Sequence, residues 1–488
     1  MRLFPTALFF ASLVIGGSLR AAEPIEQDAL HDDVVPAGAA STSPAPRVER
    51  TSVTIDWSRL GAETSRRHFS INASLGARPP SSAHPGYQAG MAYMNAGVLR
   101  YHKGIVSRAL FDPKVRGGPG WIDVENRRWN REKIREAFEA FTPAPGTDIV
   151  VNIAYWPPWL EKDKRLDPER HEEFAEFCAE LVRILNIEQK RGVRYFEITN
   201  ERDFVYWRAQ LKTGEPPLVA EFAKIFLRCA EAMKRVDPTI KTGGPAAASG
   251  EENVFPFHRE FVALTLPQLD FFSFHGYATG TADQPDDFIY DKTRWLGKLI
   301  ARHRRLLDEL SPDRHIELHF NEYNIAWTWR IDEPRMRNHK GAVFDSLLLI
   351  SAFHAGADVT NAWNDQERVY GKLDPQNDFA LRLGAHVFHY FNGWLVGRSV
   401  AATSEHPSAV VPFAVRSADG HAFVLVNRSA TATSVDLSFA GADLSAASAD
   451  FARISETGLE TDRIGPGQLV SPLVLPPHSV SFYRIGGD

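Results

Sequence analysis

The chain has 488 residues, of which 44% are hydrophobic and 24% are charged, so it is long enough for one large domain and a smaller second one. Its formal net charge of −6 argues against nucleic acid or an anionic membrane as a main partner, because both attract basic surfaces. Cys178 and Cys229, the two cysteines, lie in helix-like segments. We expect two buried thiols, with a disulfide between neighbouring helices as the alternative.

Residues 1–22 resemble an export signal. Arg2 is followed by a mainly apolar run up to Ile15 and then by small residues, and this run is too short to span a bilayer. Residues 23–50 contain several prolines and show no apolar period, so we expect a flexible leader there. The sequence therefore predicts a secreted or periplasmic protein without a membrane span.

Residues 51–397 alternate apolar, strand-like runs with helix-like stretches. The predicted strands are 68–72, 97–102, 148–154, 194–201, 240–244, 269–274, 315–322 and 358–363. The predicted helices are 131–141, 169–189, 218–236, 291–310 and 339–354. This alternation predicts an α/β fold, a closed parallel (β/α)8 TIM barrel with right-handed crossovers.

From residue 398 the pattern changes to short alternating strands separated by turn residues, as in 413–416, 422–427 and 434–439. The pattern predicts an antiparallel β-sandwich domain over residues 398–488. Residues 51–60 contain another alternating run, which pairs either with this domain or with the barrel.

Two of the predicted barrel strands close on the same pair of residues. Residues 194–201 end in Asn200-Glu201, and residues 315–322 end in Asn321-Glu322. Because the active site of such a barrel lies at the carboxyl ends of its strands, polar residues there indicate chemistry. Each glutamate alone is as readily a surface or salt-bridging residue, but the duplication favours a catalytic pair.

Carboxyl groups at the ends of strands four and seven suit hydrolysis of a glycosidic bond with retention. One carboxyl group protonates the leaving oxygen and the other attacks the anomeric carbon, at a separation of about 5–5.5 Å. Strand alternation predicts that Glu201 shares a face with Glu197 and that Glu322 shares one with Phe320, while the asparagines turn sideways. Glu197 itself is expected to be a buried ion-pair partner of Arg100.

At these residues the sequence resembles glycoside hydrolase clan A, and most closely family 39, the β-xylosidase and α-L-iduronidase group. The resemblance extends over the whole barrel and the appended domain. The matching pieces are Leu99-Arg100-Tyr101-His102, Phe196-Glu197-Ile198-Thr199-Asn200-Glu201, His275-Gly276-Tyr277, Asn321-Glu322-Tyr323-Asn324 and Ala362-Trp363. It implies an exported retaining glycoside hydrolase, β-xylosidase-like, with Glu201 as the acid/base and Glu322 as the nucleophile.

The resemblance also implies roles for the residues around the two carboxylates. Asn200 would bind the 2-hydroxyl of the bound sugar, and Tyr277 would donate a hydrogen bond to Glu322 and help to keep it ionised. Arg100 would lie beneath the same carboxylate as a stabilising charge.

His102 and His275 would line the sugar subsite, although each residue alone is as readily a hydrogen-bonded core histidine. Tryptophans also follow several predicted strand ends, where their flat faces suit sugar rings. Trp156 and Trp363 are the expected stacking platforms. The full set is Trp156, Trp159, Trp327, Trp329 and Trp363.

The chain departs from the family pattern at three positions next to the matching pieces. Thr199 stands where family members usually have Trp, Arg202 where they have Pro, and Lys103 where they have Gly. Both carboxylates are retained, so these changes bear on the substrate. The alternatives are another clan A activity, such as an α-L-arabinofuranosidase or an endo-glycanase, or a catalytically silent carbohydrate-binding protein.

No cofactor or metal is expected. His315 and His319 are four residues apart, a spacing that brings ligands together on a helix, but they lie in a predicted strand. The run Gly243-Gly244-Pro245 lacks the Lys and Ser/Thr of a phosphate-binding loop. The expected partner is an oligo- or polysaccharide substrate.

Overall fold

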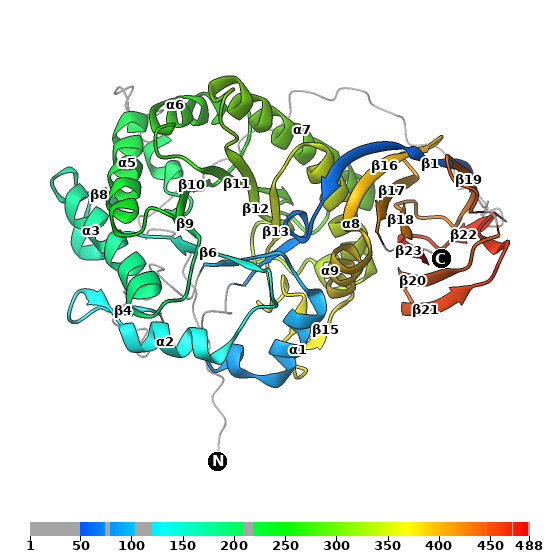
Figure 1. Ribbon diagram of the computed structural model, residues 1–488, viewed down its shortest axis with the longest axis horizontal. Helices are drawn as coiled ribbons and strands as arrows, with labels where there is room; N and C mark the ends of the chain where they lie inside the picture. The colour runs from blue at the N-terminus through cyan, green and yellow to red at the C-terminus, as the bar shows by residue number, and fades with distance from the viewer. Residues whose placement is uncertain are drawn as a thin grey trace, which may run out of the picture.

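The computed structural model describes residues 49–73, 79–102, 120–207, 218–418, 420–444, 446–470 and 472–486. The predicted export signal, the leader up to residue 48 and Lys103 lie outside these residues. Figure 1 shows two units side by side, a barrel of strands ringed by helices and a curved sheet that contains the C-terminal strands.

Eight parallel strands close into a barrel in the order β10-β11-β12-β13-β2-β3-β6-β9, which confirms the predicted (β/α)8 fold. In chain order these strands are β2 (Ser70–Asn72), β3 (Val98–Tyr101), β6 (Asp148–Ile153), β9 (Tyr195–Ile198), β10 (Lys241–Ala247), β11 (Phe271–Thr279), β12 (Glu317–Ala326) and β13 (Val359–Ala362). The ring closes where β13 pairs with β2. All eight carboxyl ends therefore meet at one mouth.

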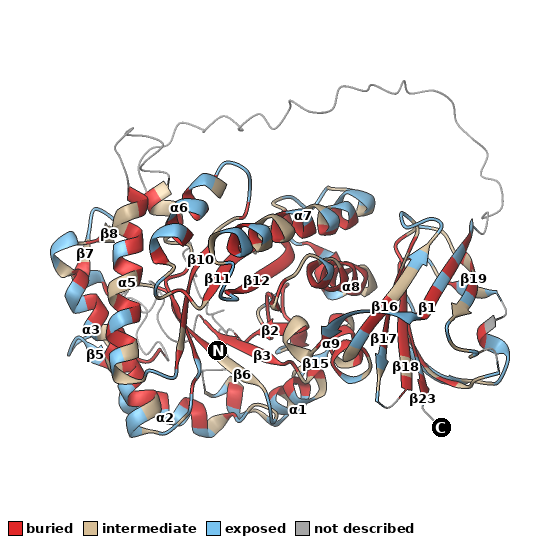
Figure 2. Cartoon of the chain, turned by 45° about the horizontal axis from the view of Figure 1, so that its top comes forward, coloured by how far each residue is buried: buried red, intermediate tan, exposed pale blue. Residues whose placement is uncertain are grey.

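Helices cover the outside of the barrel, and Figure 2 shows that their buried faces turn toward the strands. The α-helices are α1 (Pro85–Met94), α2 (Arg131–Ala140), α3 (His171–Val182), α5 (Leu218–Val236), α6 (Phe255–Thr265), α7 (Asp286–Leu310), α8 (His339–His354) and α9 (Leu383–Trp394). Helix α7 begins at Asp286 instead of the predicted residue 291, directly after Pro285. Acidic residues in its first turn, Asp286 and Asp287, favour this earlier start through the helix dipole.

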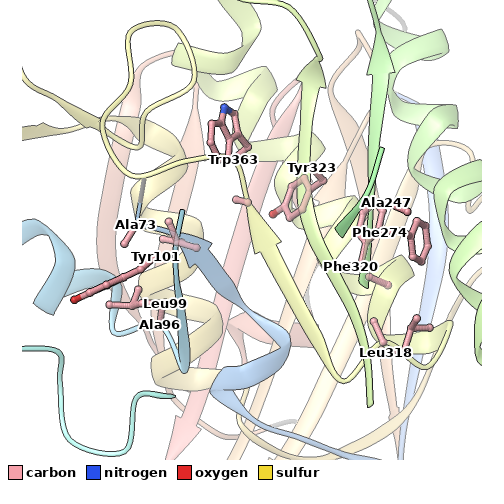
Figure 3. Close-up of a cluster of buried hydrophobic side chains, with 14 of the residues drawn as sticks. Ala73, Ala96, Leu99, Tyr101, Ala247, Phe274, Leu318, Phe320, Tyr323 and Trp363 are labelled. Carbon is pink, nitrogen blue, oxygen red and sulfur yellow. The ribbon is translucent and has the colours of Figure 1, made fainter. Parts of the chain in front are cut away.

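A large apolar cluster fills the space between strands and helices; part of it is drawn in Figure 3. A smaller apolar layer occupies the barrel interior and consists of Val98, Val150, Tyr195, Phe271 and Val359. Because side chains alternate along a strand, the next inward residue on each of these strands lies two positions further toward the mouth. These residues are all polar and all buried: Arg100, Asn152, Glu197, Ser273 and Asn361.

The second unit is a nine-stranded sheet in the order β21-β20-β23-β18-β17-β16-β1-β19-β22. Its strands are β1 (Glu49–Thr64), β16 (Gly397–Ser404), β17 (Val410–Ser417), β18 (Gly420–Asn427), β19 (Thr433–Ala440), β20 (Ala449–Ser455), β21 (Gly458–Ile464), β22 (Leu473–Leu475) and β23 (Ser479–Gly486). Its pairs are antiparallel except for β1 with β19. Among the residues that the structure describes there are also three two-stranded hairpins: β4 (Ile122–Asp123) with β5 (Arg128–Trp129), β7 (Glu161–Lys162) with β8 (Arg165–Leu166), and β14 (Leu373–Asp374) with β15 (Ala380–Leu381).

Strand β1 lies between β16 and β19, although in sequence it precedes the whole barrel. Val53, Ile55 and Trp57 alternate inward and belong to the apolar core of the sheet domain. At its far end the Thr64 hydroxyl donates to the carbonyl oxygens of Leu395 (2.7 Å) and Gly397 (3.0 Å). The chain therefore enters the barrel from the sheet and returns to the same sheet when it leaves.

Cys178 in α3 and Cys229 in α5 are both buried free thiols, so the disulfide alternative is wrong. Burial, together with the neighbouring Cys229, raises the pKa of the Cys178 thiol well above its ordinary value. Among the described helices, none combines the length and the hydrophobicity that crossing a membrane requires.

The position of β1 predicts the effect of two substitutions in that strand. Trp57→Ala, at a side chain that is 1% exposed, is expected to lower the free energy of unfolding by about 3–5 kcal/mol, because it opens a cavity in the sheet core. Leu60→Ala, at a side chain that is 51% exposed, is the control and should change it by less than about 0.5 kcal/mol. Denaturant unfolding measures both; equal effects would contradict the packing described for β1.

Candidate active site

The polar layer at the mouth is centred on Arg100, whose side chain is fully buried. Its Nε donates to Glu197 (2.6 Å), its Nη1 to Asn72 (3.0 Å) and Glu322 (2.9 Å), and its Nη2 to Asn200 (2.7 Å). Burial alone lowers the pKa of Arg100, but the two carboxylates raise it above its ordinary value. The guanidinium therefore stays charged and ties together side chains from strands two, one, four and seven.

Glu197, the ion-pair partner of Arg100, has hydrogen-bond partners at both of its carboxylate oxygens. Besides the ion pair with Arg100, it accepts hydrogen bonds from Asn152 (2.7 Å), Ser273 (2.6 Å) and Asn321. Its predicted role as a buried ion-pair partner is confirmed. With both oxygens occupied in this way, Glu197 supports the site and is not positioned to react with a substrate.

A β-bulge in β12 turns Glu322 into the mouth. The register between β11 and β12 shifts by one residue just before His275, which pairs with Glu322. Phe320 and Tyr323 belong to the apolar cluster outside the barrel, and Asn321 and Glu322, which lie between them in sequence, both bond to residues of the polar layer. The prediction that Glu322 shares a face with Phe320 is wrong, because strand alternation breaks at a bulge.

Both carboxylate oxygens of Glu322 have partners: Arg100 donates to Oε1 and the Tyr277 hydroxyl donates to Oε2, each at 2.9 Å. Burial raises the pKa of Glu322, but the positive charges of His275, Arg100 and His102 outweigh it, so the pKa lies below its ordinary value. Glu322 is therefore ionised at neutral pH.

Asn200 and Glu201 reach the mouth by a different backbone route. Strand β9 ends at Ile198, and both Thr199 (φ 71°) and Glu201 (φ 53°) have positive φ angles. The Glu201 amide donates to the carbonyl oxygen of Ala246 at the end of the neighbouring strand (2.8 Å). Because the pleat does not continue past Ile198, Asn200 does not turn sideways as predicted but points to the same site as Glu201.

The two glutamates meet at His275. Its Nδ1 lies 3.0 Å from an oxygen of Glu201 and 3.6 Å from an oxygen of Glu322. Burial lowers the pKa of His275, but both carboxylates raise it, and the net shift is upward. The Glu201 side chain is 44% exposed and that of Glu322 only 7%, so of these two glutamates it is Glu201 that is open to solvent.

Glu201, His275 and Glu322 each offer a ligand atom within 4.8 Å of the others, which is close enough to surround a cation. Arg100 already places a positive charge 2.9 Å from Glu322. A metal ion there would meet this repulsion, so the donor set does not suit a resident cation.

His102 and Trp363 lie together at the end of strands two and eight. The Nδ1 of His102 pairs with the amide oxygen of Asn152 (2.7 Å), and its ring meets that of Trp363 at a centroid distance of 5.5 Å. Figure 3 shows Trp363 above the end of its strand. Both predicted residues are thus brought to the mouth.

Trp156, in contrast, does not reach the site, and its predicted role as a stacking platform is wrong. The ring is only 1% exposed and packs edge-on against Phe174 and Tyr206, while its indole nitrogen donates to Glu161 (3.3 Å). The chain turns after strand three and directs this indole into the core against α3. Trp327, which follows β12, is instead 65% exposed.

Sequence reasoning missed Asn72 and Asn152, which bind Arg100, His102 and Glu197. The signal was present, because each is a polar residue near the end of an apolar predicted strand. What distinguishes them from other asparagines is their contact with the buried ion pair, since Asn72 accepts a hydrogen bond from Arg100 and Asn152 donates one to Glu197.

A (β/α)8 barrel with two glutamates close together at the ends of strands four and seven is the arrangement that the predicted resemblance to clan A glycoside hydrolases implies. Residues 167–365, which include both glutamates, match the model of glycosyl hydrolases family 39. Over these residues the predicted resemblance to family 39 is confirmed.

Two β-xylosidases are similar to part of the chain. That of Caldicellulosiruptor saccharolyticus is 28% identical over 167 residues, which cover 32% of this chain and 31% of that protein. That of Geobacillus stearothermophilus is 29% identical over 141 residues, which cover 27% of this chain and 26% of that protein. The alignments thus span about a third of the relatives or less.

Solved structures resemble the fold over nearly the whole chain. An α-L-arabinofuranosidase from Thermotoga maritima aligns with a TM-score of 0.64 at 13% identity, covering 90% of this chain and 100% of that one. A GH39 enzyme from Xanthomonas axonopodis pv. citri aligns with a TM-score of 0.61 at 14% identity, covering 92% and 98%. Because the sequence identities are this low, the similarity shows a shared fold, a barrel with an appended sheet domain, and nothing further.

The contacts of Arg100 predict that Glu197→Ala strongly destabilises the protein. The substitution leaves a buried guanidinium without its closest partner, and we expect a loss of about 3–5 kcal/mol in the free energy of unfolding. Glu139→Gln, which removes an exposed carboxylate paired with Arg135, is the control and should leave the denaturation midpoint unchanged. A Glu197→Ala protein as stable as the wild type would contradict the central role given to this pair.

Proposed function

We propose that the protein is an exported retaining glycoside hydrolase with β-xylosidase-like activity, in which Glu322 is the nucleophile and Glu201 the acid/base. The observation that carries this proposal is that one oxygen of Glu201 and one of Glu322 lie within 4.8 Å of each other. Retaining enzymes need carboxyl groups about 5–5.5 Å apart, whereas inverting enzymes need about 6.5–9.5 Å to admit a water molecule. The short separation favours direct attack by a carboxylate.

In the first step an ionised Glu322 oxygen attacks the anomeric carbon, and Glu201 donates its proton to the leaving oxygen. The difference in exposure supports this division of roles, because the leaving group and the later water must reach Glu201. Tyr277 and Arg100 hold the attacking carboxylate in place. In the second step Glu201 takes a proton from water, which attacks the same carbon and releases Glu322.

Asn200 is well oriented to bind a sugar hydroxyl. Its amide oxygen accepts a hydrogen bond from Arg100, which leaves the amide nitrogen as the group that donates to the substrate. A contact of this kind to the 2-hydroxyl strengthens as the transition state forms. Arg100 therefore orients both Asn200 and the nucleophile Glu322.

The preference for a xyloside comes from the two similar β-xylosidases, and export comes from the signal-like residues 1–22. Neither rests on the geometry of the site. A panel of aryl glycosides identifies the sugar without affecting the assignment of the two glutamates.

The proposed mechanism predicts the stereochemistry of the product. Proton NMR during hydrolysis of an aryl β-xyloside should show β-xylose first, before mutarotation produces the other anomer. If the α-anomer appears first, the reaction inverts and Glu322 is not a nucleophile.

Two variants separate the roles within the same assay. Glu322→Ala should abolish turnover of every substrate, whereas Glu201→Ala should retain activity on aryl glycosides with good leaving groups, which need little protonation. Equal loss on good and poor leaving groups in Glu201→Ala would contradict its role as the proton donor. Affinity without any release would indicate a binding protein.

The hydrogen bond from Tyr277 predicts a change in the pH profile. The bond favours the charged form of Glu322, so its removal in Tyr277→Phe should raise the pKa of that carboxyl. Because Glu322 must be ionised to attack, the acid limb of the kcat/KM profile should move to higher pH. An unshifted acid limb would contradict this role, and Tyr101→Phe, at a buried tyrosine outside the polar layer, is the control.

A further inference from the structure

We propose that Arg202 forms a subsite for a carboxylate on the leaving group, so that the enzyme cleaves glycosides whose leaving part is a uronic acid. This inference rests on the proposed function and adds the substrate class on the leaving-group side. It is carried by the position, the fixed orientation and the unpaired charge of the Arg202 guanidinium.

The position of Arg202 is on the proton-donor side of the mouth. Arg202 follows Glu201 directly, and Tyr155 follows β6, the strand that pairs with β9. The proton donor must contact the oxygen of the leaving group, so a side chain next to Glu201 adjoins the part of the substrate that leaves. The backbone of Arg202 therefore adjoins the side of the mouth from which the leaving group departs.

The guanidinium of Arg202 is held in one orientation. Its central carbon lies 4.0 Å from the ring centroid of Tyr155 and 5.8 Å from that of Trp156. Its Nε donates to the carbonyl oxygen of Asn200 (3.3 Å). An arginine has five N–H donors in a planar fork, so these contacts fix the plane and leave the four N–H groups of the two Nη atoms for a ligand.

The positive charge of Arg202 is not neutralised by any carboxylate of the described residues, since none lies within ion-pair distance of it. The buried Arg100 is different, because it pairs with both Glu197 and Glu322. The whole chain carries a net charge of −6 and so does not attract anions in general. A preference for an anionic substrate therefore has to come from a local cation such as this one.

A carboxylate is the ligand that this arrangement fits best. Two parallel N–H groups of a guanidinium bind the two oxygens of a carboxylate, and such charge-assisted pairs are stronger than hydrogen bonds to neutral hydroxyls. The aromatic ring beneath the guanidinium excludes water from one side and offers an apolar face beside it. A sugar acid attached through its hydroxyl to the cleaved bond supplies this carboxylate.

The test compares 3-carboxyphenyl and 3-carbamoylphenyl β-xylosides, which are similar in shape and differ in charge. We expect the wild type to prefer the carboxylate in kcat/KM, and Arg202→Gln to lower this charged-to-neutral ratio about 10- to 100-fold. Arg202→Lys keeps the charge without the fork and should give an intermediate ratio. Arg453→Gln, which removes an arginine stacked on Phe451 in the sheet domain, is the matched control and should keep the wild-type ratio.

Equal turnover of the two xylosides by the wild type, or the same ratio in Arg202→Gln, would overturn the proposed subsite but not the hydrolase. Absence of turnover with both would refute the proposed β-xylosidase-like activity instead. In that case the binding of the two xylosides to the Glu322→Gln protein, measured by calorimetry, still decides the subsite. Tighter binding of the carboxylate xyloside than of the neutral one, with this difference lost in the Glu322→Gln/Arg202→Gln double variant, would support the subsite. Equal affinities for the two xylosides would reject it.

Discussion

One buried cation, Arg100, determines how the mouth of this barrel is built. Removing a guanidinium from water is costly unless its N–H groups find oxygen partners, and here these partners are Glu197, Asn72, Asn200 and Glu322. The same requirement extends to the neighbours of its partner, since the inward Asn152 and Ser273 donate hydrogen bonds to Glu197. Glu322, the proposed nucleophile, and Asn200, the residue proposed to bind the sugar, are both anchored to this charge.

The two Asn-Glu pairs reach the same opening through different distortions of the backbone. In β12 a bulge lets two consecutive residues, Asn321 and Glu322, face inward. After β9 the left-handed conformations of Thr199 and Glu201 do the same for Asn200 and Glu201. In a regular strand one member of each pair would face the helices. The irregular backbone is therefore what allows each pair to contribute two polar groups to one site.

The surroundings of the two carboxylates differ in a way that suits different tasks. Glu322 is buried, fully hydrogen-bonded and surrounded by cations, which keeps it ionised. Glu201 is partly exposed, and the next residue in the chain, Arg202, stacks its guanidinium on Tyr155. His275 lies between them, with its Nδ1 near an oxygen of each carboxylate. The sheet domain contributes none of these side chains, but it joins both ends of the barrel segment through β1 and β16.

Strand and helix periodicity predicted the barrel, because its elements are long enough for the apolar pattern to identify them one by one. The duplicated Asn-Glu at two predicted strand ends singled out Glu201 and Glu322 without coordinates, and the resemblance to family 39 added Arg100, His275 and Tyr277. Local patterns do not contain information about packing between distant segments. For this reason Trp156 was wrongly placed at the site, and Asn72 and Asn152 were overlooked.

The sequence by itself determined the kind of barrel and the two carboxylates, since these depend on residue types and their spacing along the chain. Only the tertiary structure decided the sheet to which β1 belongs, the direction in which Trp156 points and the separation of the two glutamates. The physical reason is that a bulge, a positive φ angle or a hydrogen bond to a distant guanidinium arises from contacts between segments that are far apart in sequence. Such contacts leave no periodic trace in the order of the residues.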